Sequence, residues 1–329
     1  MTDQPINFTL AFPQKRVFKI VETSMMRVIL ERTLSVHVLS ALVVWYGRSR
    51  LGKTTTALLM VDKLAAIYDP NNPDAFRAVH YEVGEVEAYS GNEMKRGIKS
   101  LYNAALGTLL DNAVYVRDPP ESLAARLVHG LRLRNIQMIF VEEAGCLSLD
   151  AIRGMVLVRD VAENTGWPLT IVFIGMDDLP VKMTRLPQIE NRVHEWCYFE
   201  EYDLDNTWAI LAELHPHFAS LDRDNKEHQE LVKFIHDTYG GIPGLIVPFL
   251  QRLDHEINKL RAANITFQVD LQLLRATHLR TARAKNKSIS KSQEECRGKP
   301  TRRESSSIIT QTKSQNAGHS SKGGNRKDT

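Results

Sequence analysis

The sequence is poor in cysteine. Only 3 of its 329 residues are cysteines. They stand at positions 146, 197 and 296, form no C-x-x-C pair, and leave one residue over in any disulfide pairing. An odd and widely spaced set of this kind does not suit a disulfide framework. We therefore expect a protein of a reducing compartment whose cysteines serve as packing residues.

Long apolar runs are also absent. The longest, around residues 36–46, is far below the roughly 20 residues that a membrane helix needs. The first residues, MTDQPINFTLAFPQKR, lack the charged and then apolar pattern of a signal peptide. These absences predict a cytoplasmic protein that does not enter a membrane. With 43% hydrophobic residues, the chain can still bury a sizeable core, and its length favours about two domains.

Charge is nearly balanced overall but unevenly distributed. The net charge is +3, yet residues 280–329 contain 13 Lys and Arg against 4 Asp and Glu, whereas the remainder contains 29 against 35. The basic segment is rich in Ser, Lys, Asn and Gly, so it buries too little apolar surface to offset the entropy of ordering it. We predict an acidic folded body followed by a disordered basic tail.

Short β-branched or aromatic runs alternate with helical patterns, which is typical of a parallel sheet with helices on both faces. The expected strands lie at residues 40–47, 77–84, 136–143, 169–175 and 195–201. The helices expected around them lie at 16–32, 53–67, 93–109, 121–133, 149–163 and 177–185. After residue 203 only helical patterns follow, at 206–214, 226–239 and 242–260, and we interpret His215 to His217 as a turn between two of these helices.

These patterns predict four parts of the chain. They are an N-terminal helical extension over residues 1–38, an α/β domain over 39–203, a small helical lid over 204–279, and the basic tail over 280–329. The change from alternating strands and helices to helices alone marks the boundary between the second and third parts. No internal repeat is evident.

The first expected strand leads into a phosphate-binding motif. GRSRLGKT, from Gly47 to Thr54, matches G-x-x-x-x-G-K-[ST], with a strand before it and a helix after it, as the motif requires. Glycines let the backbone wrap closely, so that its N–H groups converge on phosphates at the helix N-terminus. Lys53 is expected to reach the β- and γ-phosphates of ATP, and Thr54 to hold Mg²⁺. The full set of expected nucleotide contacts is Gly47, Arg48, Ser49, Arg50, Leu51, Gly52, Lys53, Thr54 and Thr55.

The third expected strand ends in two carboxylates. In MIFVEEAG, Glu142 and Glu143 follow four apolar residues, where P-loop ATPases have an Asp that helps to hold Mg²⁺ and a Glu that orients water. We therefore expect Glu142 to be a metal ligand and Glu143 a catalytic residue. Glu142 is one methylene longer than the usual Asp, which favours slow turnover. The alternative is that both are surface acids at a strand end.

The order of these elements resembles that of the AAA+ ATPases, and three stretches carry the resemblance: GRSRLGKTT, MIFVEEAGCLS and VFIGMDDLPVKMTRLPQIENRVHEWCYFEEYDL. Within that superfamily the sequence is similar to the ATP-dependent transposition regulators TniB, TnsC and MuB, over roughly residues 17–260. The resemblance implies a P-loop AAA+ α/β domain with a five-stranded parallel sheet, a small α-helical lid and the disordered basic tail.

The resemblance also implies a second catalytic residue. The family has a Ser-Arg-Phe-like triplet before the fifth strand, and here this triplet reads Asn-Arg-Val at residues 191–193. Arg192 would accordingly be an arginine finger that is offered to the ATP of the next subunit and stabilises the transition state. An ordinary solvated arginine is the alternative.

Two positions depart from the family pattern. Met176 stands where a polar sensor residue is expected, so Asp177 would have to serve or the sensor is absent. Gly244 stands where many AAA+ proteins have an arginine that faces the γ-phosphate. Transposition regulators of this group often lack that arginine. Its loss argues against efficient hydrolysis.

The family assembles on duplex DNA, so the resemblance implies an enzyme that hydrolyses ATP to ADP and phosphate and binds double-stranded DNA as a ring or helical filament. Its implied partners are further copies of the chain, a transposase and a target-selection protein. Lys95, Arg96 and Lys99 lie within about one helical turn and are candidate DNA-phosphate contacts. Such a cluster is also common on a solvated helix face. The tail could bind DNA by counterion release or tether a protein.

Two other functions stay open at this point. A small-molecule or nucleotide kinase shares the phosphate cradle and the parallel sheet, but its lid would carry several arginines, and residues 206–260 contain only Arg223 and Arg252. A nucleotide switch that binds only protein partners would leave the charge of the tail without a role.

Overall fold

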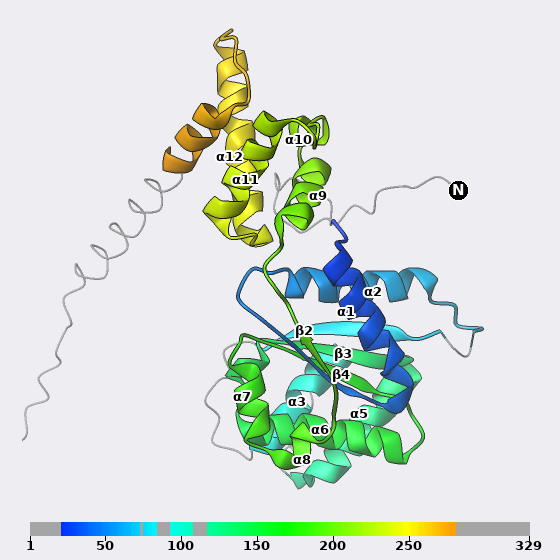
Figure 1. The fold of residues 1–329 in the computed structure, drawn as a ribbon. Coiled ribbons are helices and arrows are strands. Elements are labelled where there is room, and N and C mark those ends of the chain that lie inside the picture. The colour runs from blue at the N-terminus through cyan, green and yellow to red at the C-terminus, as the bar shows by residue number, and fades with distance from the viewer. Residues whose placement is uncertain (1–20, 73–74, 84–92, 108–116, 281–329) are drawn as a thin grey trace, which may run out of the picture. The chain divides into compact units, whose positions relative to one another are not determined.

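The computed structural model describes residues 21–72, 75–83, 93–107 and 117–280 (Figure 1). These residues lie within one compact unit, Met1–Thr281. The predicted basic tail, apart from Arg280, lies outside the described residues, and so does the predicted N-terminal extension up to residue 20.

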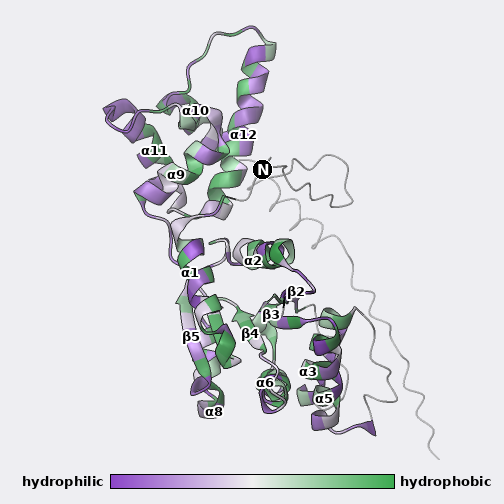
Figure 2. Ribbon diagram, turned by 90° about the vertical axis from the view of Figure 1, so that its right-hand side faces the viewer, coloured by the Kyte–Doolittle hydropathy of each residue, from purple (hydrophilic) through white to green (hydrophobic). Residues whose placement is uncertain are grey.

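The α/β part is built on a five-stranded parallel sheet, as predicted. Its strands are β1 (Leu42–Tyr46), β2 (Arg77–Glu82), β3 (Ile136–Glu142), β4 (Thr170–Ile174) and β5 (Val193–Tyr198). Their order across the sheet is β2-β3-β4-β1-β5, and all neighbours are parallel. β3 and β4 are buried along their whole length and are largely green in Figure 2, as expected for strands covered on both faces.

Helices cover both faces of this sheet (Figure 1). One face carries α1 (Ser24–Ser35), the short η1 (His37–Leu39) and α2 (Lys53–Ile67). The opposite face carries α3 (Glu93–Leu106), α5 (Pro120–Leu133), η2 (Ala144–Cys146), α6 (Leu149–Asn164), α7 (Leu179–Thr184) and α8 (Pro187–Glu190). Because successive strand residues point to opposite faces, Leu42 and Val44 pack in one apolar core, whereas Val43 and Trp45 pack in the other.

Local contacts shift two helices from their predicted bounds. α1 begins at Ser24 because Thr23 caps it, its side-chain oxygen accepting a hydrogen bond from the backbone N–H of Met26 at 3.3 Å. Of the predicted helix at 16–32, residues 21–23 are therefore not helical, residues 16–20 lie outside the described residues, and the helix ends at Ser35. α3 ends at Leu106, three residues before its predicted end, where Gly107 adopts a φ of 62° that favours glycine.

Reciprocal close contacts fix the packing of α3 on α6. A Cβ atom at Gly97 would lie 2.1 Å from the carbonyl oxygen of Ala151, and one at Gly154 would lie 2.0 Å from the carbonyl oxygen of Met94. Both distances are far below van der Waals contact, so only glycine fits at either position. The two helices consequently approach through their backbones.

The helical lid consists of α9 (Leu204–Leu214), α10 (Pro216–Ala219), α11 (Lys226–Tyr239) and α12 (Pro243–Ala262), and residues 271–280 are also helical. It has its own apolar core, with Leu211, Phe249 and Leu253 fully or almost fully buried. The interpretation of residues 215–217 as a turn was wrong: His215 Nδ1 accepts a hydrogen bond from the backbone N–H of His217 at 3.2 Å and caps α10.

The described residues bear on the expectations about membrane helices and cysteines. No helix among the described residues is long and apolar enough to cross a membrane. Cys197 is completely buried in β5, where burial raises its pKa to about 12, so it is an unreactive packing residue as expected. Cys146 is exposed, so the expectation was wrong for that residue. Cys296 lies outside the described residues.

Candidate nucleotide-binding site

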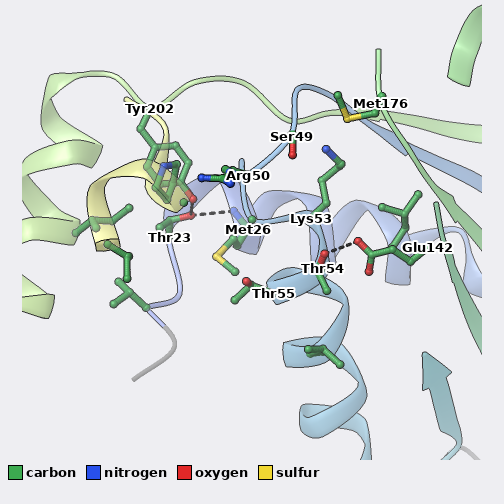
Figure 3. Close-up of a pocket in the computed structure, with 18 of the residues that line it drawn as sticks. Thr23, Met26, Ser49, Arg50, Lys53, Thr54, Thr55, Glu142, Met176 and Tyr202 are labelled. Carbon is green, nitrogen blue, oxygen red and sulfur yellow. Dashed lines mark hydrogen bonds between the residues drawn. The ribbon is translucent and has the colours of Figure 1, made fainter. Parts of the chain in front are cut away.

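A cavity of about 610 Å³ opens where β3 and β4 and the loop after β1 reach the carboxyl edge of the sheet (Figure 3). Its walls include Lys53, Glu142 and Gly175 from the α/β part, Thr23 from the start of α1, and Gly244 from α12. The carboxyl edge of a parallel sheet is the usual place for a ligand in such folds. The volume lies within the range of small-molecule sites.

The loop between β1 and α2 has the backbone of a phosphate cradle. Gly47 has a φ of 146° and Gly52 a φ of 96°, values that favour glycine. At Gly47 a Cβ atom would also lie 2.5 Å from the carbonyl oxygen of Phe199. Leu51 is completely buried and anchors the loop in the core beneath α1 and α2. The loop is therefore fixed on both sides by contacts that do not involve a ligand.

The predicted contact set divides into two groups. Ser49, Arg50, Gly52, Lys53, Thr54 and Thr55 line the cavity. Gly47, Arg48 and Leu51 do not line it. Arg48 instead forms an ion pair with Glu201 at 2.8 Å, which helps to lower the pKa of that carboxylate.

Lys53 lies inside the loop with its ammonium group enclosed by backbone. Its Nζ donates hydrogen bonds to the carbonyl oxygens of Gly47 and Arg48, both at 2.7 Å, and the residue is only 8% exposed. Burial lowers the pKa of Lys53, while the negative charges of Asp177, Glu142 and Glu143 act against that shift. A cation so placed at the wall of a cavity is suited to bind an anion such as a phosphate.

Glu142 has two partners, one of which the sequence did not indicate. Thr54 Oγ1 donates to Glu142 Oε1, and His80 Nε2 lies 2.7 Å from Glu142 Oε2. The contact with Thr54 is drawn in Figure 3. No local pattern indicated His80, because its approach to Glu142 depends on the register between β2 and β3.

The oxygens of Thr54 and Glu142 fit Mg²⁺, which prefers hard oxygen ligands. Among the described residues, no group of three or more His, Cys, Asp or Glu could hold a metal ion. A magnesium ion at this position would therefore need further oxygens, which phosphates and water commonly supply. The oxygens of Thr54 and Glu142 are therefore suited to a metal site whose other ligands come from a bound nucleotide and water.

Glu143 differs from its neighbour in conformation and exposure. It has a φ of 56°, in the left-handed region that a non-glycine residue seldom adopts, and it is exposed while lining the cavity. The turn that follows is tied to α7, because Lys182 Nζ donates to the carbonyl oxygen of Gly145 at 2.6 Å. Both glutamates line the cavity, but Glu143 is exposed, whereas Glu142 is buried.

The two departures from the family pattern also lie at this cavity. Met176 lines it and is 41% exposed. Asp177 does not line it, although its charge acts on Lys53. At Gly244 a Cβ atom would lie 2.6 Å from the Cβ of Arg50, and the backbone N–H of Gly244 donates to the carbonyl oxygen of Arg50 at 3.1 Å. An arginine at 244 would therefore require the phosphate loop or α12 to move.

Arg192 and the basic cluster lie apart from the cavity. Arg192 precedes β5 and forms an ion pair with Asp160 on α6. Its role as a finger for the next subunit stays a prediction, since such a residue lies outside the cavity of its own chain. Lys95, Arg96 and Lys99 lie on α3, are half-buried and do not line the cavity. Their contact with DNA also stays a prediction.

The end of the cavity near the lid was not predicted. Thr23 Oγ1 and the hydroxyl group of Tyr202 are 3.1 Å apart and both residues are buried (Figure 3). Met26, Ile210 and Val247 supply apolar wall. These residues come from α1, α9, α12 and the segment after β5, so no local pattern could have identified them together.

No protein-family model matches this sequence, and no curated protein matches it. Solved structures do match the fold. The ORC2 protein of Aeropyrum pernix, solved as ADPNP–ADP complexes, aligns with a TM-score of 0.51 and 19% identity, over 77% of this chain and 65% of the ORC2 chain. Cdc6p of Pyrobaculum aerophilum aligns with a TM-score of 0.50 and 16% identity, over 76% of this chain and 65% of the Cdc6p chain.

The chain thus spans slightly less than two thirds of the length of these structures. At such low identity the likeness concerns the fold alone. It confirms the predicted fold, an α/β domain with a five-stranded parallel sheet followed by a small helical part. It does not single out the transposition regulators within the superfamily.

Proposed function

We propose that this chain is a AAA+ ATPase that binds ATP with Mg²⁺ in the cavity, assembles with further copies on double-stranded DNA, and recruits or activates a transposase at target DNA. The observation that carries the proposal is the convergence of Lys53, Thr54 and Glu142 on one wall of a cavity, with Glu143 exposed beside them. The AAA+ fold and the resemblance to TniB, TnsC and MuB support the wider role.

In this proposal the loop backbone and four side chains of the cavity have distinct tasks. The N–H groups of the glycine-rich loop and the Lys53 ammonium bind the β- and γ-phosphates. Thr54 and Glu142 hold Mg²⁺, which when bound neutralises charge on the phosphate oxygens. Glu143 orients the water that attacks the γ-phosphate, because its carboxylate is accessible from the cavity. The product of this reaction is ADP and phosphate.

Assembly would couple the nucleotide to DNA. Arg192 would exchange its ion pair with Asp160 for the phosphates held by the neighbouring copy. Lys95, Arg96 and Lys99, together with the basic segment 280–329, would contact DNA phosphates. A ligand that binds only the assembled state shifts the equilibrium from monomer to oligomer by mass action. ATP would therefore promote binding to DNA, and hydrolysis would reverse it.

Fluorescence anisotropy with a labelled DNA duplex tests this proposal. The measurement is made with ATP, with ADP and without nucleotide, each at two salt concentrations. We expect tight binding only with ATP, and weaker binding at the higher salt because counterions are released from DNA. A candidate transposase is then added to the complex of protein, ATP and DNA. Recruitment should appear as a further rise in anisotropy. Equal DNA binding with and without ATP would contradict the proposal, and ATP binding without any DNA binding would favour a nucleotide switch.

A further inference from the structure

The carboxylate of Glu142 is buried, and both of its oxygens have a partner. The residue is 7% exposed. A buried carboxylate is costly unless hydrogen bonds replace its lost water. Oε1 accepts a hydrogen bond from Thr54 Oγ1, and Oε2 lies 2.7 Å from His80 Nε2. An ionised carboxylate can only accept a hydrogen bond, so we assign the hydrogen of this contact to His80 Nε2.

The register of the sheet brings His80 to this position. β2 pairs with β3 so that His80 lies opposite Phe140, and Glu82 lies opposite Glu142. His80 therefore reaches Glu142 along the diagonal between the strands, a distance that long side chains can span. Glu82, the direct cross-strand neighbour, is exposed and carries the same charge as Glu142, so it cannot donate a hydrogen bond to it.

A second contact matters more for Glu142 than it would for an aspartate. The additional methylene of glutamate adds a rotatable bond, so a single hydrogen bond from Thr54 leaves the carboxylate free to swing. The His80 ring is largely buried, its side chain being 18% exposed. It therefore offers a donor at a fixed place and removes that freedom.

We propose that His80 is a positioning residue that orients the Glu142 carboxylate, so that Oε1 remains beside Thr54 at the cation site. The inference rests on the proposed binding of ATP with Mg²⁺ and adds to it a residue on the edge strand β2. His80 does not line the cavity, so it acts through Glu142 and not on the nucleotide. Partners of this kind around metal ligands typically change metal affinity by about 10–100-fold when they are replaced.

The test compares nucleotide affinity with and without Mn²⁺, using the full chain and a fluorescent, non-hydrolysable ATP analogue. The measured quantity is the metal-dependent gain in affinity. His80→Phe removes the donor and should reduce this gain about tenfold, while affinity in EDTA stays within about twofold. His80→Gln places an amide N–H near the position of Nε2 and should keep the gain within about threefold. His194→Phe, on the other edge strand β5 and exposed, should leave the gain unchanged.

A double-mutant cycle identifies the group through which His80 acts. Glu142→Asp shortens the side chain and breaks the contact, so His80→Phe should change the gain by less than about twofold in that background. An unchanged gain for folded His80→Phe in the parent background would overturn the inference. So would an equal loss in both backgrounds, because His80 would then act through some other group.

Two further outcomes complete the test. If His80→Phe does not fold, as judged by circular dichroism melting, the ring nitrogens of His80 in the parent are followed by NMR, with His80→Gln supplying the assignment. Their chemical shifts should change when Mg²⁺ is added to the nucleotide-bound protein, and an absence of change would overturn the inference.

A parent protein that shows no metal-dependent gain in nucleotide affinity would instead contradict the proposed function itself, and the inference with it.

Discussion

The two ends of the cavity are built in different ways. At the phosphate end, backbone sterics and hydrogen bonds fix each group: Gly47 has no room for a Cβ atom, Lys53 donates to two carbonyl oxygens, and Glu142 is held on both oxygens. At the lid end, apolar side chains such as Met26 and Val247 form the cavity wall, and such side chains make no directional contacts with one another. Packing adapts to a changed side chain more readily than a directional contact does. Substitutions at the phosphate end should therefore have the larger effects on nucleotide chemistry.

Replacing the lysine of the loop should have the largest effect. Lys53→Ala removes the only cation among the described residues that is enclosed by the phosphate loop, and we expect at least a 100-fold loss of ATP affinity, or about 3 kcal/mol. Isothermal titration calorimetry measures it. Lys63→Ala, on the same helix but paired with Glu22 at the surface, is the matched control. Retention of ATP binding by Lys53→Ala would place the nucleotide elsewhere.

The second prediction separates hydrolysis from binding. Glu143→Gln keeps the shape of the side chain but removes its charge, so we expect hydrolysis to fall about 100-fold while ATP affinity changes by less than about threefold. DNA complexes formed with ATP should then persist. Phosphate release is the measurement, with Glu190→Gln at the exposed end of α8 as the control. Hydrolysis at the parent rate would show that Glu143 does not orient the attacking water.

The third prediction concerns the contact between Gly244 at the start of α12 and Arg50 in the phosphate loop. Gly244→Ala puts a Cβ atom 2.6 Å from the Cβ of Arg50, so the start of α12 or the loop has to move. We expect ATP affinity to fall roughly tenfold, less than for Lys53→Ala, because α12 can shift as a unit. Gly130→Ala is the control, since it lies in α5 and meets only the flexible side chain of Leu106. An unchanged affinity would show that the lid does not constrain the loop.

The smallest predicted effect concerns stability in acid and involves one histidine of the α/β part and one of the lid, both outside the cavity lining. Burial lowers the pKa of His37 in the α/β part and of His215 in the lid below 6.5. Below pH 6.5 the unfolded chain therefore binds more protons than the folded chain, and the free energy of unfolding falls as the pH falls through the lowered pKa values. Urea titrations between pH 7.5 and 5 measure this loss.

The substitution His37→Gln tests whether His37 causes part of the loss of stability in acid. His37 is buried between Thr170 Oγ1 at 3.0 Å and Gln137 Oε1 at 3.1 Å, so its neutral ring fits both partners. His37→Gln should make the fall in stability with acid shallower, whatever its effect at neutral pH. His194→Gln, at an exposed position on β5, should leave the slope as it is. A parent protein equally stable at pH 7.5 and 5 would contradict this account.

The same contrast explains what could be predicted from the sequence. α2 begins and ends at the predicted residues, Lys53 and Ile67, and its start was predictable because the glycine-rich loop before it is a local signal. β1, β3 and β4 were predicted because parallel strands buried on both faces are largely continuous apolar runs. The partly buried edge strands β2 and β5 were predicted from their β-branched and aromatic residues. Thr54 and Glu142 were assigned to one metal site because P-loop ATPases hold Mg²⁺ with a hydroxyl after the glycine-rich loop and a carboxylate at a strand end.

Contacts that depend on the pairing of distant strands or on tertiary packing could not be predicted from the sequence. His80 meets Glu142 only through the pairing of β2 with β3. Thr23 meets Tyr202 across 179 positions of sequence. The contact of Gly244 with Arg50 likewise joins the lid to the loop. A single sequence contains no signal for such pairs, because the sequence neighbours of each residue do not indicate its partner in the fold.

The most direct test of the account is a crystal structure of the chain with a non-hydrolysable ATP analogue and Mn²⁺. The account predicts the triphosphate against the backbone of residues 47–55 and an anomalous difference peak for Mn²⁺ beside Thr54 Oγ1 and the Glu142 carboxylate. A nucleotide bound away from this loop, or a metal ion held by other residues, would contradict it.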